Sequence, residues 1–328
     1  MSLIASLDSG VSALKTFSKG IQVIANNIAN VNTTGYKGSR ASYADNFSNL
    51  LQQSAPSSST GTGSNADFLG IGTGVHLQAS SASFTQGTLT STGSPSDLGV
   101  SGDGFFIVRD SVNGVSYATR SGDFRIDDQG YLVTSEGYRV QGLSDGTATF
   151  DATATGTTLK FTKTETAPST VGDIRINFVV AVGSGVTNST GGTFTDAEVD
   201  AVKPTQKSYS ISRKGDISVS LSNGDEVTVG RVLLQNYRDP NALSREGNNL
   251  FSNFEAAGPV GGLAMTQANN SPGAAGNGDL VSGALELSNV DLSEEFSSMI
   301  VTQRSFQAGS RIVTVSDSML EEVINLKR

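Results

Sequence analysis

Cysteine is absent from this chain of 328 residues, and histidine occurs once, as His76. A chain without cysteine has no disulfide bonds, no thiolate metal sites and no cysteine nucleophile. A single histidine also disfavours most hydrolase triads and zinc sites. No second histidine lies near GIGTGVHLQAS to share a metal, so we interpret His76 as an ordinary loop or strand residue.

Charge is scarce as well. Charged residues make up 16% of the chain, against roughly 25% in typical soluble proteins. The formal net charge is −9, and no lysine- or arginine-rich patch is present, so the electrostatic footprint of nucleic-acid binding is missing. Serine, threonine, asparagine and glycine take up the difference, which suits β-rich, turn-rich structure.

Long apolar runs are also missing. The sequence has no run of about 18 consecutive apolar residues, so neither a transmembrane helix nor membrane insertion is predicted. The first residues, MSLIASLDSG, lack the basic region, apolar core and cleavage site of a signal peptide. If the protein leaves the cell, we expect a route without a cleaved signal peptide.

Candidate chemistry is thin. GDGFF at 102–106 contains a Gly-x-Gly, but the full dinucleotide-binding pattern and its following helix are absent. Asp123, Asp127 and Asp128 have no EF-hand spacing and suit hairpin turns. We therefore predict no catalytic residue, no metal and no cofactor. A distant acid pair, as in a carbohydrate-active enzyme on a β scaffold, stays open.

Apolar residues recur every seven positions at both ends of the chain. Near the start, two rows occupy heptad positions a and d, with Gly10 as the exception: Leu7, Leu14, Ile21 and Ile28, then Leu3, Phe17, Ile24 and Val31. Near the end, the row is Leu285, Leu292, Met299, Phe306, Val313 and Leu320, widened by Phe296, Ile300, Val315, Met319, Val323 and Ile324. This pattern predicts two long helices that pair as a coiled coil. In the ordinary alternative, each stripe packs on the protein's own globular body.

The first predicted helix carries few charges and many amides. From residue 3 to residue 31 its charged residues are Asp8, Lys15 and Lys19, and its last part holds Asn26, Asn27 and Asn30. Asparagine is a mediocre helix former, because its amide competes with the backbone for hydrogen bonds. Amides can pair without burying a charge, so we interpret them as facing neighbouring subunits. Alternatively they weaken and cap the helix end, since Gly35 in NTTGY permits a left-handed turn.

Between the ends, the pattern is that of short strands and turns. APSSSTGTGSNAD at 55–67 is typical of a polar linker, and strands are predicted at 104–110, 115–122, 123–133, 138–143 and 208–237. The fold class is therefore mainly β, with long N- and C-terminal α-helices that pair as a coiled coil. We predict a helical domain at 1–40 and 285–328, a β-rich core at 41–143 and 209–284, and an inserted outer β domain at 144–208, which includes the apolar strand DIRINFVVAV.

Three blocks of the chain resemble the rod and hook proteins of the bacterial flagellum. IQVIANNIANVNTTGYKGSRASYAD at 21–45 is similar to their N-terminal motif, in which an NNIAN helix leads into a T-x-G-Y-K turn. FTQGTLTSTGSPSDLGVSGDGFFIV at 84–108 resembles a second shared block. The segment at 282–326, with its SNVD turn and M-I-x-x-Q-R helix, resembles the C-terminal block. The blocks occur in the family's order.

Within this family, the hook protein is the favoured match and the distal rod protein is the alternative. YKGSRASYADNF, GYRVQGL and RDPNALSREGNNLF look hook-like, whereas the serine-rich segment after Leu51 also suits a distal rod protein. The resemblance implies a non-enzymatic subunit of a homopolymeric helical tube, exported by the flagellar type III apparatus. A hook would lie outside the cell and transmit torque from rod to filament, and a rod would lie in the basal body. The implied partners are the flagellar rod, the hook cap and the hook–filament junction proteins.

The helices and the N-terminal motif together supply a set of predicted subunit-interface residues: Ile24, Asn26, Asn27, Ile28, Asn30, Tyr36, Lys37, Leu292, Met299, Phe306, Val313 and Leu320. A non-flagellar surface β protein or adhesin is a rival interpretation, favoured by the Thr/Ser/Gly-rich middle. It would predict a signal peptide and no need for two heptad helices, and the sequence indicates the opposite on both points.

Overall fold

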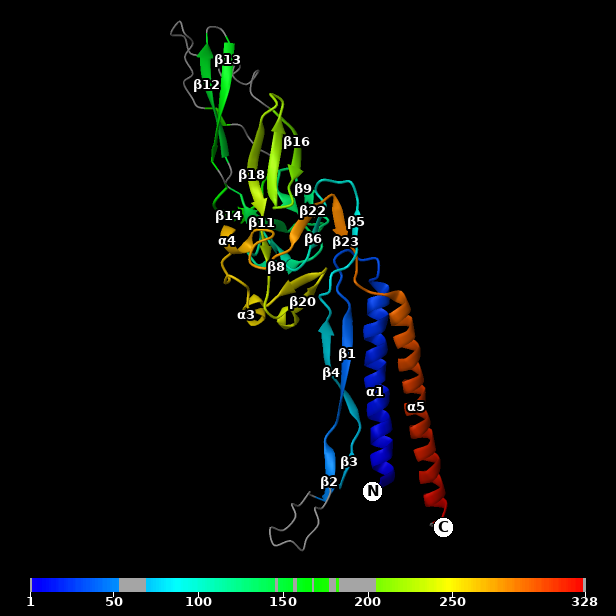
Figure 1. The fold of residues 1–328 in the computed structure, drawn as a ribbon. Helices are drawn as coiled ribbons and strands as arrows, with labels where there is room; N and C mark the ends of the chain where they lie inside the picture. Colours follow the sequence, from blue (N-terminus) through cyan, green and yellow to red (C-terminus); the bar gives the residue numbers. More distant parts are fainter. Residues whose placement is uncertain are drawn as a thin grey trace, which may run out of the picture. The chain divides into compact units, whose positions relative to one another are not determined.

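The computed structural model describes residues 2–52, 69–144, 147–155, 158–166, 168–176, 181–182 and 205–326. The chain forms two compact units. The helical unit comprises Met1–Val31, Lys37–Phe84 and Val290–Arg328, and the β unit comprises Asn32–Tyr36 and Thr85–Asn289. Both helices that the heptad rows predict are present, and the rest is mainly β structure (Figure 1).

Two long helices run antiparallel in the helical unit, α1 (Ser2–Ala29) and α5 (Leu292–Asn325) (Figure 1). The Ser6 hydroxyl lies 3.1 Å from that of Ser316, which places the start of α1 beside the end of α5. Asp291 caps α5, since its carboxylate accepts hydrogen bonds from the backbone N–H groups of Ser293 and Glu294 at 2.7 and 3.3 Å.

Gly10 marks a close approach of the two helices. A β-carbon on Gly10 would lie 2.9 Å from Val313 Cγ2, and one on Gly309 would lie 3.5 Å from Ala13 Cβ. The position that breaks the apolar rows of α1 is thus one where this helix packs tightly on α5. Only a residue without a side chain fits there undisturbed.

A long two-stranded ribbon completes the helical unit. β1 (Ser39–Asp45) pairs antiparallel with β4 (Val75–Ala82), and β2 (Ser48–Gln52) pairs with β3 (Leu69–Gly72). The Thr16 hydroxyl on α1 donates to the Val75 backbone oxygen at 2.9 Å. The sequence-based division assigned this ribbon to the β-rich core, but it packs with the helices. The predicted linker at 55–67 lies outside the described residues.

The β unit is built on one large antiparallel sheet with the order β16-β17-β18-β11-β7-β8-β21-β20. The bounds are β16 Gln206–Ile211, β17 Asp216–Leu221, β18 Glu226–Val232, β11 Arg139–Leu143, β7 Phe105–Arg109, β8 Ser116–Thr119, β21 Leu250–Ser252 and β20 Ser244–Gly247. Short strands extend it: β9 (Arg125–Ile126), β10 (Leu132–Val133), β14 (Val171–Asp173) and β19 (Leu234–Gln235).

Smaller elements surround this sheet. β6 (Leu98–Ser101) pairs with β22 (Asp279–Ser282), and β5 (Leu89–Ser91) pairs with β23 (Ala284–Glu286). The short helices are η1 (Pro240–Ala242), α3 (Phe254–Ala257) and α4 (Gln267–Asn270). Alternation along the strands buries one continuous apolar core, which includes Leu98, Phe106, Val108, Leu132 and Val140.

The predicted insertion at 144–208 is only partly separate from this core. β12 (Thr147–Thr155), β13 (Thr158–Thr166) and β15 (Ala181–Val182) form their own three-stranded sheet. However, β14 pairs with β11, and Ile174 and Ile176 are fully buried in the main core. Residues 177–180 of the predicted apolar strand and residues 183–204 lie outside the described part.

Within the part of the chain that the structure describes, neither long helix is sufficiently apolar to cross a membrane.

Candidate functional site

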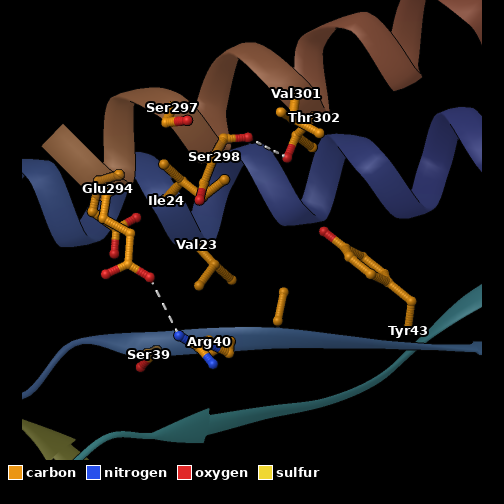
Figure 2. A pocket seen from close by; sticks show the side chains of 12 residues that line it. Val23, Ile24, Ser39, Arg40, Tyr43, Glu294, Ser297, Ser298, Val301 and Thr302 are labelled. Carbon is orange, nitrogen blue, oxygen red and sulfur yellow. Dashed lines mark hydrogen bonds and ion pairs between the residues drawn. The ribbon is translucent and has the colours of Figure 1, made fainter.

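A hollow of about 370 Å³ opens in the helical unit between α1, β1 and α5 (Figure 2). Its lining is Val23, Ile24, Ser39, Arg40, Ala41, Tyr43, Glu294, Glu295, Ser297, Ser298, Val301 and Thr302. The three elements come from the two ends of the sequence and meet because α1 and α5 pack along each other. The hollow therefore exists only when both ends of the chain are folded together.

The floor of the hollow is apolar and partly aromatic. Ile24 is buried, and the ring of Tyr43 packs edge-on against Phe17 with 5.8 Å between ring centroids. Gly20 leaves room for the Tyr43 hydroxyl beside α1, because a β-carbon there would collide with it. Burial raises the pKa of the Tyr43 hydroxyl above its usual value.

Asn27 joins all three elements next to the hollow. Its amide nitrogen donates to the Ser39 backbone oxygen at 2.8 Å and to Glu295 Oε1 at 2.9 Å. Its amide oxygen accepts a hydrogen bond from the Ser39 backbone N–H at 2.9 Å. Asn27 is buried, with the residue 1% exposed, and its amide is satisfied inside its own chain. This differs from the expectation that the amide would find its partner on a neighbouring subunit.

Three charged side chains line the rim. Arg40 and Glu294 form an ion pair of 3.4 Å between largely exposed side chains, which is visible in Figure 2. Burial raises the pKa of the Glu295 carboxyl; the hydrogen bond from Asn27 and the charge of Arg40 oppose this effect, and the charge of Glu294 adds to it. An exposed pair such as Arg40–Glu294 contributes little to stability, so it stays available for exchange with another partner.

The inner face of α5 alternates large apolar residues with small or polar ones. Met299, Val313 and Leu320 are half-buried and Phe306 is 37% exposed. Between them come Thr302, Gly309 and Ser316, of which Gly309 and Ser316 are buried. These small residues let α5 approach α1 closely, which the apolar rows alone did not predict.

A second row of apolar side chains on α5 faces outward. We call it the outer stripe, and each member is between 47% and 62% exposed: Val301, Ile312, Val315, Met319 and Val323. At about 100° per residue these positions fall within roughly 80° of one another around the helix. The opposite flank carries the exposed polar residues Gln303, Gln307, Thr314 and Glu321, and near its start the exposed Phe296 and Ile300. Exposed apolar stripes of this length mark an interaction surface in soluble proteins.

The predicted interface residues fall into different surroundings. Ile28 is half-buried, Leu292 is 40% exposed, and Tyr36 and Lys37 are buried at 5% and 1% exposure. Asn26 is exposed, and it accepts hydrogen bonds from the Asn30 side chain through its backbone oxygen at 2.9 Å and its side-chain oxygen at 3.1 Å. These hydrogen bonds lie within the final turn of α1. They agree with the alternative interpretation, in which the amides act at the end of the helix.

Sequence reasoning missed the residues that complete the hollow. Arg40 and Tyr43 lie in a segment without a clear strand pattern, and Glu295 and Thr302 occupy polar positions between apolar heptad residues. Small or polar residues recur every seven positions, three residues after members of the apolar row of α5: Glu295, Thr302, Gly309 and Ser316. This spacing is a sequence signal that could have indicated Glu295. His76 lies on β4, and its Nδ1 is 2.8 Å from Asn46 Oδ1. No cluster of potential metal ligands occurs among the residues that the structure describes.

Segments at both ends and in the middle of the chain match known protein families. Residues 7–37 match the family described as flagella basal body rod protein, residues 99–219 the flagellar hook protein FlgE/F/G D1 domain, and residues 281–326 the flagellar basal body rod FlgEFG protein C-terminal. The flagellar basal-body rod protein FlgG of Bacillus subtilis is 34% identical over 99% of this chain and 100% of its own length. The chain belongs to the flagellar rod and hook protein family.

Both branches of this family are similar to the chain. The rod protein FlgG of Borreliella burgdorferi is 29% identical, and the hook protein FlgE of the same bacterium is 27% identical, each over 99% of this chain and 100% of the relative. A crystal structure of the Helicobacter pylori flagellar hook protein FlgE2 covers 60% of this chain at 9% identity, with a TM-score of 0.37. The sequence-based expectation of a flagellar axial protein is confirmed, and the family comprises structural components of the flagellum.

Proposed function

We propose that this chain is a rod subunit of the flagellar basal body, which self-assembles with further copies into a helical tube. The outer stripe of α5 is the observation that carries this proposal. A helix pair that is complete within one chain would place only polar residues outside, whereas α5 presents apolar residues along Val301–Val323. In a tube, neighbouring copies would cover this stripe.

The lengths of the relatives favour a rod over a hook. The alignment with the Bacillus subtilis rod protein spans 328 residues and takes in each protein almost completely. Alignments with hook proteins of Borreliella burgdorferi and Rhizobium meliloti span 453 and 432 positions. These two hook proteins therefore carry segments that this chain lacks. The sequence motifs favoured the hook protein over the distal rod protein, and this comparison of lengths favours the opposite order. The flexible, torque-transmitting hook is therefore the second candidate.

The remaining functional details follow from this assignment. In the assembled tube we expect α1 and α5 to act as a coiled-coil pair, with the β unit contributing to an outer layer. We expect export through the flagellar apparatus without a cleaved signal peptide, and contacts with adjoining rod and hook proteins. The basal body would be the location of a rod subunit.

Assembly of the purified chain tests the proposal. The variant Ile312→Ser/Met319→Ser removes two side chains of the outer stripe, and Gln303→Ser/Gln307→Ser is the matched control on the polar flank. Burying one large aliphatic side chain stabilises an interface by about 1.5–3 kcal/mol, and each 1.4 kcal/mol is about tenfold in affinity. We expect the first variant to raise the minimum polymerising concentration at least tenfold and the control to change it little.

Electron microscopy of the polymer distinguishes the two candidates. A straight tube supports the rod assignment, and a curved tube favours the hook. Equal effects of the two double variants on assembly, with unchanged melting of both monomers, would contradict the role of the outer stripe.

A further inference from the structure

The outward face of α1 carries two lysines, Lys15 and Lys19, and both are exposed. Neither forms an ion pair with another residue in the described part of the chain. At about 100° per residue, Lys19 lies roughly 140° and Lys15 roughly 180° around the helix from the buried Ile24. Both lysines therefore point away from the hollow of their own chain.

The rest of this outward row has no large apolar side chain to bury. Its other exposed members are Ala5, Asp8, Gln22 and Asn26. A surface that receives the row must therefore supply hydrogen-bond acceptors and negative charge. The outer stripe of α5 cannot do this, because its members are aliphatic.

The hollow between α1, β1 and α5 offers such a surface. Its rim holds one positive and two negative side chains, a net charge of −1, from Arg40, Glu294 and Glu295. Four serine and threonine hydroxyls also line it: Ser39, Ser297, Ser298 and Thr302 (Figure 2). The apolar floor suits the methylene stem of a lysine, whose charged head stays at the rim. Val301 belongs to both the hollow and the outer stripe, so the two surfaces are continuous.

Building on the proposed function, we propose that this hollow receives Lys15 and Lys19 of α1 from a second copy of the chain. The lysine stems lie along the floor, and the ammonium groups lie against the carboxylates of Glu294 and Glu295. Glu294 then exchanges its weak pair with Arg40 for a partner on the neighbouring subunit. A hollow of about 370 Å³ is near the lower end of the usual range for ligand pockets, so it admits side chains and excludes a folded segment.

This contact is heterologous, because the lysine row and the hollow are different surfaces of the same unit. Each copy can offer its lysines to one neighbour and its hollow to another. Such a contact does not end at a dimer, and it generates an open helical assembly when the rotation does not close into a ring. The geometry of the helical unit thus supplies a direction of growth as well as a contact.

Site-directed crosslinking tests the contact directly, because the natural chain has no cysteine. Lys19→Cys and Glu294→Cys are made as separate full-length proteins, mixed, allowed to polymerise, and treated with a short bifunctional maleimide. A maleimide bridge is needed, since a lysine and a glutamate that meet hold their β-carbons further apart than a disulfide allows. We expect a crosslinked dimer in the mixture, at least fivefold more abundant than in either variant alone.

Two further mixtures make the result specific. Lys19→Cys with Gln303→Cys, on the polar flank of α5, should give no more dimer than the single variants. Lys19→Glu should weaken assembly at least tenfold, and combining it with Glu294→Lys in one chain should recover most of that loss.

Each outcome bears on one proposal or the other. A wild-type chain that forms no polymer overturns the proposed function and this inference with it. A normal polymer that gives no Lys19→Cys/Glu294→Cys dimer, or gives equal dimer with Gln303→Cys, overturns the inference alone. A dimer between Lys19→Cys and Arg304→Cys, in the absence of a Lys19→Cys/Glu294→Cys dimer, would also overturn it, by placing the lysines against another side of α5.

Discussion

Asn27 on α1 donates a hydrogen bond of 2.9 Å to the carboxylate of Glu295 on α5, 268 positions further along the chain. The same amide exchanges two hydrogen bonds with the backbone of Ser39 on β1. One buried side chain therefore links the first helix, the ribbon and the last helix. We therefore expect this amide to stabilise the fold of the single helical unit. An amide that only contacted a neighbouring subunit would not have this effect.

The variant Asn27→Ala should destabilise the single chain. It leaves the Ser39 N–H, the Ser39 carbonyl and the Glu295 carboxylate without this partner, at about 1–3 kcal/mol for each group left unsatisfied. Thermal melting of the monomer, followed by helical circular dichroism, measures the loss. Asn26→Ala is the control, because Asn26 is exposed and should cost under about 1 kcal/mol. A monomer that melts unchanged while assembly fails would restore the idea that Asn27 faces a neighbouring subunit.

Glu295 should make the helical unit less stable as pH rises. Because burial raises its pKa, the folded chain holds its proton more tightly than the unfolded chain does. Its favourable contribution is fully present below the ordinary glutamate pKa and is lost as pH rises through the higher, folded value. Glu295→Gln removes this dependence, and the new side-chain oxygen can still accept from Asn27.

The pH prediction is checked by urea unfolding of wild type and Glu295→Gln at several pH values. Relative to wild type, the variant should gain stability as pH rises above about 4, since glutamate in the unfolded chain titrates near 4.3. Glu294→Gln is the matched control, as this neighbour is largely exposed. If the stability gained by Glu295→Gln over wild type shrank with rising pH, the folded chain would favour the charged carboxylate of Glu295. That result would contradict the prediction.

The terminal helices could be predicted because their signal is local and periodic. Seven-residue spacing persists over several turns at each end, and the structure has helices there, α1 and α5. The strands of the main sheet were also predictable from alternation and glycine-containing turns, as at β7 and β11. Each of these signals lies within one short stretch of sequence.

The hollow could not be predicted, because its parts have no local signal. β1 alternates only between half-buried and exposed residues, since it belongs to a two-stranded ribbon with no sheet core behind it. The role of Asn27 depends on Ser39 and Glu295, which come together only after folding. The sequence analysis placed Val315, Met319 and Val323 of the outer stripe in one wide stripe with the inner row of α5, because sequence alone does not show which side meets α1.

In the β unit, Arg120 and Glu286 form a buried ion pair whose disruption should be costly. Arg120 Nη1 lies 3.2 Å from Glu286 Oε2, and the two side chains are 2% and 0% exposed. Arg120 also donates to the Gly102 carbonyl at 2.8 Å, and the Gly87 N–H donates to Glu286 Oε1 at 2.9 Å. Burial lowers the pKa of the Arg120 guanidinium, and the charge of Glu286 opposes this shift.

Glu286→Gln should therefore cost about 3–5 kcal/mol, because it leaves a buried charge without its counter-ion. The double variant Arg120→Met/Glu286→Gln should lose less than the sum of the single variants, since it also removes the orphaned charge. Guanidinium denaturation of the four proteins forms a double-mutant cycle. Additive losses would mean that the two charges act independently in spite of their contact.

Gly10 gives a test of helix packing against helix propensity. Replacing an interior helical glycine by alanine normally gains about 1 kcal/mol. Here the new methyl group would lie 2.9 Å from Val313 Cγ2, on a stiff β-branched side chain, and overpacking costs about 1–3 kcal/mol. We expect Gly10→Ala to lower the melting temperature, and Val313→Ala in the same chain to remove most of the clash. If Gly10→Ala alone stabilises the monomer, the helices have room to separate, and the tight approach of α1 and α5 is not a constraint on the fold.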